Sequence, residues 1–192
     1  MRTRRALLAC VVAAVAACAS PALAGTDLQK RPAADFALTD GTSGETVTLA
    51  GQRGRVVVLT FLYTNCPDVC PLTAEKLRDA RAQVGDAARD LALIAVSVDP
   101  VHDTPAATRE FVHAHRLDGA LRFLVGDRAS LERVWSAYGI AQQPGADGSV
   151  AHNDAIYVID KQGRARTLLH SDVDVATLAQ TLRTLLSESR LF

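Results

Sequence analysis

Two uninterrupted apolar runs constrain the fold of this chain more than any other feature. The runs are RVVVLTFLY at residues 55–63 and LALIAVSVD at residues 91–99, and both are rich in β-branched side chains without polar alternation. Strands of this composition are typically buried on both faces of a sheet. Residues 71–85 lie between them and have the apolar spacing of a helix that ends at Gly85. We therefore expect central strands connected by a helix.

The remaining segments complete an α/β pattern. Hairpins are predicted around the turns GTSG and KQG, because strand-like segments flank both. A helix should begin at Asp103 or Thr104, with Pro105 in its first turn. The expected elements are hairpins over 35–50 and 149–170, a strand over 122–127, and helices over 103–117, 129–140 and 174–189. This order is that of a thioredoxin-like α/β fold, with an N-terminal β-hairpin and a central mixed sheet flanked by helices.

The N-terminus has the pattern of an export signal. A basic start (MRTRR) precedes an apolar run over residues 6–18, and the small residues ALA end at Ala24. We expect an export signal over 1–24, a flexible leader over 25–34 and the thioredoxin-like domain over 35–192. VAAC, ending at Cys18, resembles a bacterial lipobox, so lipid attachment at Cys18 is an alternative. An uncleaved membrane anchor is disfavoured because Pro21 interrupts the run before about 20 apolar residues.

Charge and cysteine content narrow the functional classes. Basic and acidic residues balance at 21 each, and no basic block provides an electrostatic surface for nucleic acid. Loss of residues 1–24 would leave Cys66 and Cys70, in the segment TNCPDVCPLT, out of four cysteines. These two residues could form a redox couple, a pair of metal ligands or a structural disulfide. A disulfide across so short a loop would restrain the unfolded chain only slightly.

Position and spacing favour metal binding by the two cysteines. They follow the first central strand, at the start of its helix, where the helix dipole favours thiolate over thiol. On a helix, this spacing sets Cβ atoms about 5–6 Å apart, whereas a disulfide needs roughly 3.5–4.5 Å. Two soft thiolates select Cu(I) or zinc. We expect Asp68, Asp99 and Asp103 either to act as turn and cap residues or to frame this cleft. In the cleft, their charges would raise the pKa of both thiols.

A third ligand should come from a histidine. Of the five histidines, His113, His115 and His170 are interpreted as surface residues, and His102 adjoins a helix cap. His152 is the candidate because the loop QQPGADGSVAH, which precedes the strand AIYVID, is long enough to fold over the sheet edge. An imidazole complements two thiolates in a three-coordinate Cu(I) site or in a four-coordinate zinc site with water.

Three ordered motifs resemble the Sco/SenC family of copper proteins over about residues 33–190. They are FLYTNCPDVCPLT, AVSVDPVHDTPAA, and His152 followed by AIYVIDKQG. The resemblance implies a thioredoxin-like fold and copper ligands at Cys66, Cys70 and His152, with Cu(I) and also Cu(II) as candidate ions. Family members usually have aspartate before the histidine and a small hydroxyl residue after it. Here Ala151 and Asn153 occupy these positions, which leaves the outer support of the ligand to be established.

The same resemblance implies a metallochaperone rather than an enzyme. Its partner would be the copper-accepting subunit of cytochrome c oxidase or a related copper protein. The chain is expected to act as a monomer on the outer face of the inner membrane, either free in the bacterial periplasm or held there by an N-terminal lipid or anchor. The alternative is a thiol-disulfide reductase that keeps the recipient's cysteines reduced, with Cys66 and Cys70 as its redox pair. A thiol peroxidase is less well supported, because the motif does not provide a dedicated peroxide site.

Overall fold

The computed structural model describes residues 22–146 and 148–188. Residues 1–21 of the expected export signal, including the lipid site expected at Cys18, lie outside these ranges and remain a prediction. Within the described ranges, none of the helices combines the length and apolar character needed to cross a membrane.

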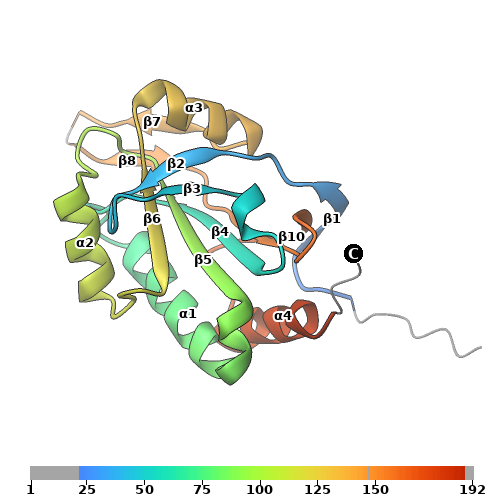
Figure 1. Ribbon diagram of the computed structural model, residues 1–192. Coiled ribbons are helices and arrows are strands. Elements are labelled where there is room, and N and C mark those ends of the chain that lie inside the picture. Colours follow the sequence, from blue (N-terminus) through green and yellow to red (C-terminus); the bar gives the residue numbers. More distant parts are fainter. Residues whose placement is uncertain (1–21, 147, 189–192) are drawn as a thin grey trace, which may run out of the picture.

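A mixed eight-stranded sheet forms the centre of the domain (Figure 1). Its strand order is β1-β10-β9-β4-β5-β6-β2-β3, and only the β4–β5 and β5–β6 pairs are parallel. The strands of this sheet are β1 (Thr26–Pro32), β2 (Ala37–Asp40), β3 (Thr46–Thr48), β4 (Val56–Leu62), β5 (Leu91–Ser97), β6 (Leu121–Val125), β9 (Ile156–Ile159) and β10 (Arg164–Leu169). A separate two-stranded hairpin contains β7 (Gln142–Pro144) and β8 (Val150–His152).

The two apolar runs form the central strands, as predicted. Every residue of β4 and β5 is buried, and the strands pair in register from Val56 with Leu91 to Leu62 with Ser97. Neither strand has a face in water, so apolar side chains are required at successive positions rather than at alternate ones. The predicted N-terminal hairpin is also confirmed as β2–β3.

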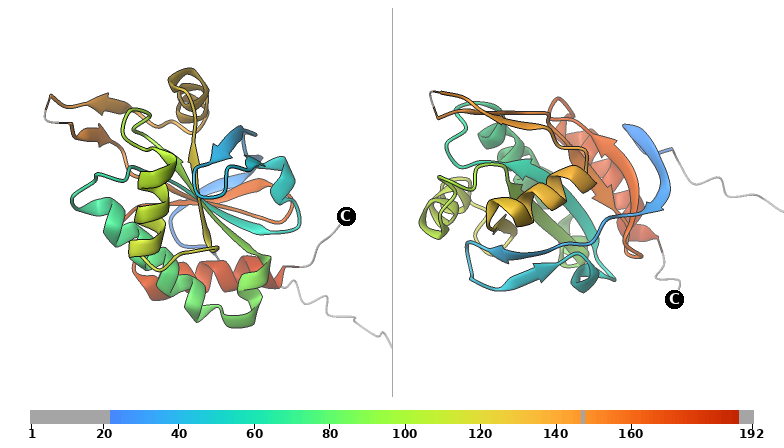
Figure 2. Two further views of the ribbon diagram at one scale, coloured as in Figure 1. Left: turned by 60° about the vertical axis from the view of Figure 1, so that its left-hand side comes forward. Right: turned by 90° about the horizontal axis from the view of Figure 1, so that it is seen from above.

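Helices cover both faces of the sheet. They are α1 (Val69–Gln83), α2 (Pro105–Ala114), α3 (Arg128–Ala137) and α4 (Val175–Ser187), with short 3-10 helices at Ala50–Gln52 and Gly85–Asp90. Helices α1, α2 and α4 lie on one face and α3 on the other (Figures 1 and 2). Successive right-handed crossovers through parallel strands place α1 and α2 on the same face. On the other face, Trp135 Nε1 of α3 donates to the backbone oxygen of Ser97 at 2.9 Å. The predicted thioredoxin-like fold is confirmed.

The segment predicted as a flexible leader contains an edge strand instead. β1 pairs antiparallel with β10, from Thr26 opposite Leu168 to Pro32 opposite Arg164. Its register shifts around Gln29 and Lys30, which both have positive φ values. The prediction was wrong because an edge strand exposed to water needs no apolar period, and β1 is almost entirely polar and exposed.

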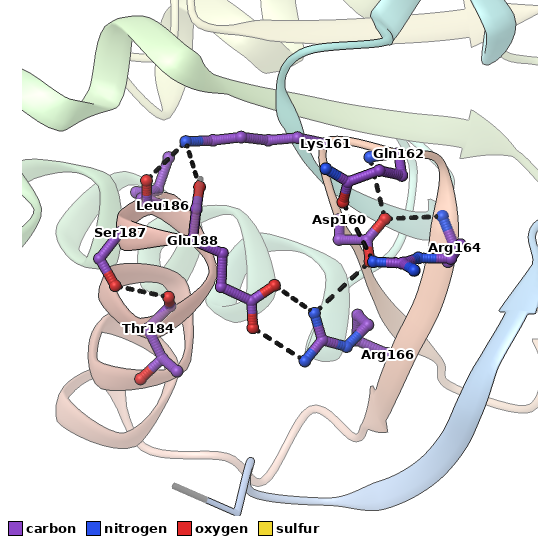
Figure 3. Close-up of polar contacts among 9 residues, drawn as sticks. All are labelled: Asp160, Lys161, Gln162, Arg164, Arg166, Thr184, Leu186, Ser187 and Glu188. Atoms are coloured by element: carbon purple, nitrogen blue, oxygen red, sulfur yellow. Dashed lines mark hydrogen bonds and ion pairs between the residues drawn. The ribbon is translucent and has the colours of Figure 1, made fainter. Parts of the chain in front are cut away.

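An ion-pair network ties the β9–β10 turn to the end of α4 (Figure 3). The buried carboxylate of Asp160 accepts from Arg164 Nε at 2.9 Å and from Arg166 Nη1 at 3.4 Å. Arg166 also binds Glu188 through both terminal nitrogens, at 2.5 and 2.9 Å. Lys161 Nζ donates to the backbone oxygen of Leu186 at 2.6 Å and so satisfies a carbonyl at the helix terminus. The Lys161 carbonyl in turn accepts from Gly54 N, just before β4, so this network lies at the end of the sheet where β4 begins.

We predict that Glu188→Ala lowers the free energy of unfolding by about 1–2 kcal/mol, because it leaves the buried Arg166 guanidinium with a weaker set of partners. The matched control is Glu132→Ala, which removes an exposed pair with Arg128 on α3 and should cost less than about 0.5 kcal/mol. Both values can be measured by urea titration. Equal losses of unfolding free energy in the two variants would show that the burial of Arg166 does not strengthen its pair with Glu188.

Candidate metal centre

The two cysteines lie where β4 leads into α1. Cys66 precedes the helix, whereas Cys70 is buried in its first turn. The backbone N–H of Cys70 donates to Cys66 Sγ at 3.4 Å, and Asp68 at the N-cap makes no side-chain capping bond. The sulfur of Cys66 therefore accepts from an amide at the helix N-terminus. Both residues are free thiols. The expected geometry of two thiols on one helix face is wrong in this respect, because Cys66 is not part of the helix.

The environment shifts the pKa values of the two thiols in opposite directions. Burial raises the pKa of Cys70 well above its usual range, and the nearby sulfur of Cys66 and the carboxylate of Asp103 add to this effect. Burial also acts to raise the pKa of Cys66. Hydrogen bonds from the Asp68 and Cys70 amides, the Cys70 thiol and the Tyr63 hydroxyl outweigh it and lower that pKa. The expectation that both thiols have raised pKa values thus holds for Cys70 and is wrong for Cys66.

Of the three acidic residues, Asp103 supports the site most directly. Its buried carboxylate accepts from Thr64 N at 2.8 Å, Thr64 Oγ1 at 2.7 Å and Ser97 Oγ at 2.5 Å. It thereby connects the chain segments that follow β4 and end β5. Asp99 forms a turn instead, since it accepts from the amides of Val101 and His102 and pairs with His102 Nδ1 at 2.7 Å.

Asp103 should make stability depend on pH. Burial is the largest effect on its carboxyl and raises its pKa, so the folded state holds this proton more tightly than the unfolded state. The resulting stabilisation is full below the ordinary pKa of aspartate and is lost as pH rises through the raised value. We predict a smaller fall in the free energy of unfolding between about pH 4 and pH 7 for Asp103→Asn than for the wild type. Urea titrations of the reduced proteins measure this, and parallel pH profiles would contradict it.

His152 is the last residue of β8, in a hairpin outside the main sheet (Figure 2). The sequence predicts a loop before it and a single hairpin over 149–170. The structure instead pairs β8 with β7 and β9 with β10. Strands of three residues, as β7 and β8 are, carry too little periodicity to be predicted. Burial lowers the pKa of His152, which favours the neutral imidazole. Its Nδ1 lies 3.1 Å from the backbone oxygen of Asn153, so donation there leaves the Nε2 lone pair for a ligand.

Asn153 also anchors the hairpin through its side chain. Its Oδ1 accepts from Ala141 N at 2.7 Å, and its Nδ2 donates to the backbone oxygen of Gly139 at 3.2 Å. Gln142 Nε2 donates to the backbone oxygen of Val98 at 3.1 Å and ties β7 to the end of β5. Ala151 is exposed and contributes only its backbone pairing. The residue after His152 therefore supports the histidine by a backbone carbonyl and an amide side chain.

Tyr63 connects the cysteine segment to the hairpin, and the sequence analysis missed it. Its backbone oxygen accepts from Cys66 N at 3.4 Å, and its hydroxyl is close enough to the Cys66 thiol and to the Val150 N–H in β8 for both groups to shift its pKa. Its ring meets that of His152 edge-on, with centroids 6.1 Å apart. An aromatic residue at the end of a buried apolar run is typical of a core residue. The sequence therefore contains no separate signal that Tyr63 links the cysteine segment to the hairpin.

The structure brings two of the three predicted ligands into contact. Cys70 N and Cys66 Sγ are in contact, whereas His152 lies on the neighbouring hairpin, where its ring meets that of Tyr63. Over 22–146 and 148–188, no three His, Cys, Asp or Glu side chains are grouped closely enough to hold a metal ion. The other histidines have different partners. These are Asp99 for His102, Asp118 for His113, the Phe111 carbonyl for His115 and Asp154 for His170.

The fold and the site define the class of this protein. It is a thioredoxin-like dithiol protein, with the dithiol where the first helix begins and a hairpin carrying a histidine beside it. The model of the SCO1/SenC family matches residues 24–187, and the chain belongs to this family.

Two solved structures and one relative illustrate the similarity. Protein SCO2 homolog, mitochondrial, of Bos taurus is 33% identical over 140 residues, which are 67% of this chain and half of that protein's length. ScoI of Bradyrhizobium japonicum, solved with copper bound, is 29% identical with a TM-score of 0.69 over 80% of this chain and 99% of its own. BsSco is a member of the Sco family of cytochrome c oxidase assembly proteins in which a disulfide switch has been identified. It shares the fold at 19% identity, with a TM-score of 0.71 over 86% of this chain and 98% of its own.

Proposed function

We propose that this protein is a copper metallochaperone that holds copper through Cys66, Cys70 and His152. The observation that carries the proposal is the contact of Cys70 N with Cys66 Sγ, which brings two free cysteines together at the start of α1, beside a hairpin whose His152 has a pKa lowered by burial. Thiolate and imidazole donors suit Cu(I), and an imidazole also suits Cu(II). The copper-bound structure of the related Bradyrhizobium japonicum protein supports the choice of metal.

The arrangement of the donors suits transfer rather than permanent storage. Cys70 is buried in the helix, whereas Cys66 and His152 are only partly buried and lie on two different segments of the chain. A partner's thiolates can replace these ligands in succession, and the departure of copper leaves the dithiol behind. We propose that the recipient is the copper-accepting subunit of cytochrome c oxidase or a related copper protein. BsSco, a member of the Sco family of cytochrome c oxidase assembly proteins, supports this recipient.

A thiol-disulfide reductase is the second candidate, and the unequal thiols favour it. A reductase needs an accessible thiolate that attacks a disulfide and a second thiol that resolves the mixed disulfide. Cys66, with its lowered pKa and partial exposure, suits the first role, and the buried Cys70 suits the second. In that case the protein would reduce the recipient's cysteines before they accept copper.

Metal analysis of the reduced protein tests the two functions. Copper and zinc are offered together to the wild type, to His152→Ala and to the control His102→Ala, whose imidazole pairs with Asp99. Loss of a group that only hydrogen-bonds a metal ligand already costs about 10–100-fold in metal affinity, so we expect loss of the ligand itself in His152→Ala to weaken Cu(I) binding about 100-fold or more. His102→Ala should bind as the wild type does. A wild type that retains no copper yet reduces disulfides rapidly would favour the reductase.

We further propose that the protein acts outside the cytoplasm, in the bacterial periplasm or attached to the inner membrane by a lipid on Cys18. The signal pattern of residues 1–24 supports export. The mass of the protein's N-terminal peptide after expression in a bacterial host distinguishes the forms. Cleavage after Ala24 gives an unmodified peptide that begins at Gly25, whereas lipid attachment gives a modified Cys18.

A further inference from the structure

Tyr63 is the residue through which the two halves of the candidate site meet. It ends the buried run that contains β4, and its side chain is only 4% exposed. Its backbone oxygen accepts from Cys66 N at 3.4 Å, and its hydroxyl is near enough to the Val150 N–H of β8 and to the Cys66 thiol for both to shift its pKa. The ring packs edge-on against His152. The same side chain thus contacts both segments that carry the outer ligands.

We propose that Tyr63 is a positioning residue for the copper site, which holds the β7–β8 hairpin against the dithiol and so directs His152 toward Cys66. This inference rests on the proposed copper-binding function.

The hairpin needs such a contact because the main sheet does not hold it. Among the strands of the described residues, β7 and β8 pair only with each other, and Gln142 and Asn153 fix the base of the hairpin near the end of β5 and the end of α3. The Val150 amide lies two residues before His152, so its proximity to the Tyr63 hydroxyl adds to the ring contact in restraining the strand that carries the imidazole. A phenol hydroxyl can accept from the amide and donate to the sulfur at the same time, which links both segments through one oxygen atom.

The test uses Tyr63→Phe, which keeps the packed ring and removes the hydroxyl. The control is Tyr138→Phe, because Tyr138 is 5% exposed and its hydroxyl donates to Ala34 O at 2.6 Å, away from the dithiol. Cu(I) affinity is measured by competition with a chromophoric chelator. We expect Tyr63→Phe to weaken binding about 10–100-fold, as loss of an outer-shell partner does, and Tyr138→Phe to leave it unchanged. In the metal-free protein, the Val150 amide should exchange with solvent faster in Tyr63→Phe.

A double variant separates positioning from general stability. If Tyr63 acts by placing His152, adding Tyr63→Phe to His152→Ala should weaken binding little further. Independent losses that multiply, or wild-type affinity in Tyr63→Phe, would overturn the role of Tyr63 and leave the copper function standing. A wild type without Cu(I) binding would overturn the copper function, and this role with it. If Tyr63→Phe does not fold, Val150→Pro removes the amide that faces the Tyr63 hydroxyl from the hairpin side and should show the same loss.

Discussion

Replacing both Cys66 and Cys70 by serine is expected to reduce copper retention from about one ion per chain to background. Hydroxyl oxygens are hard, neutral donors with little affinity for Cu(I), and a single imidazole at His152 cannot hold the ion through dialysis. The variant should still fold, because serine is close to cysteine in size. The measurement is copper content after dialysis of the reduced protein against a weak chelator, with circular dichroism to verify folding.

The chain provides a matched control for this experiment. Cys10 and Cys18 are the other two cysteines, and the proposal gives them no part in the copper site. A variant with serine at both positions should therefore retain copper as the wild type does. Equal copper content in the Cys66/Cys70 double variant and the wild type would contradict the proposed site.

In the reduced, metal-free protein, Cys66 is expected to react with iodoacetamide at least about 100-fold faster than Cys70 near neutral pH. Each unit by which the pKa of a thiol exceeds the ambient pH lowers its thiolate fraction about tenfold, and the two pKa values are shifted in opposite directions. Cys70 is also only 1% exposed, so iodoacetamide has little access to its sulfur. Peptide mass mapping over a time course measures both rates in one sample.

Single variants show whether the two thiols influence one another. Cys70 is a hydrogen-bond partner that lowers the pKa of Cys66, so Cys70→Ser should change the rate at Cys66 only modestly, since serine can still donate. Cys66→Ser should leave Cys70 slow, because burial is the main reason for its raised pKa. A Cys70 that reacts as fast as Cys66 would show that the first turn of α1 opens readily.

The central fold could be predicted because local sequence and tertiary burial agree there. In β4 and β5 every side chain is buried, so the apolar composition is continuous and visible without any knowledge of neighbours. Thr104 likewise caps α2 as its residue type suggests, by accepting from Ala107 N at 3.2 Å. β1 could not be predicted, because its strand character comes from pairing with β10, which lies more than 130 residues away in the sequence.

The candidate site was only partly predictable for a related reason. The helix N-terminus identifies the cysteines locally, and the position of Cys70 agrees with that prediction. The contact of Tyr63 with Val150 and His152 joins residues almost 90 positions apart, and no periodicity encodes such a pair. Similarly, a cysteine spacing cannot reveal that the helix begins after Cys66, since that depends on how the chain leaves β4.

The edge strand β1 has a consequence for how this protein meets other molecules. An open sheet edge is a template on which further strands can add, from another copy or from an unfolded chain. β1 covers one edge with polar residues, a register shift and the sequence Lys30-Arg31-Pro32, and β3 at the opposite edge is only three residues long. Both flanks of the sheet therefore resist strand addition. If the protein delivers copper as proposed, the end of the domain where the thiols lie is then the surface left for binding a recipient.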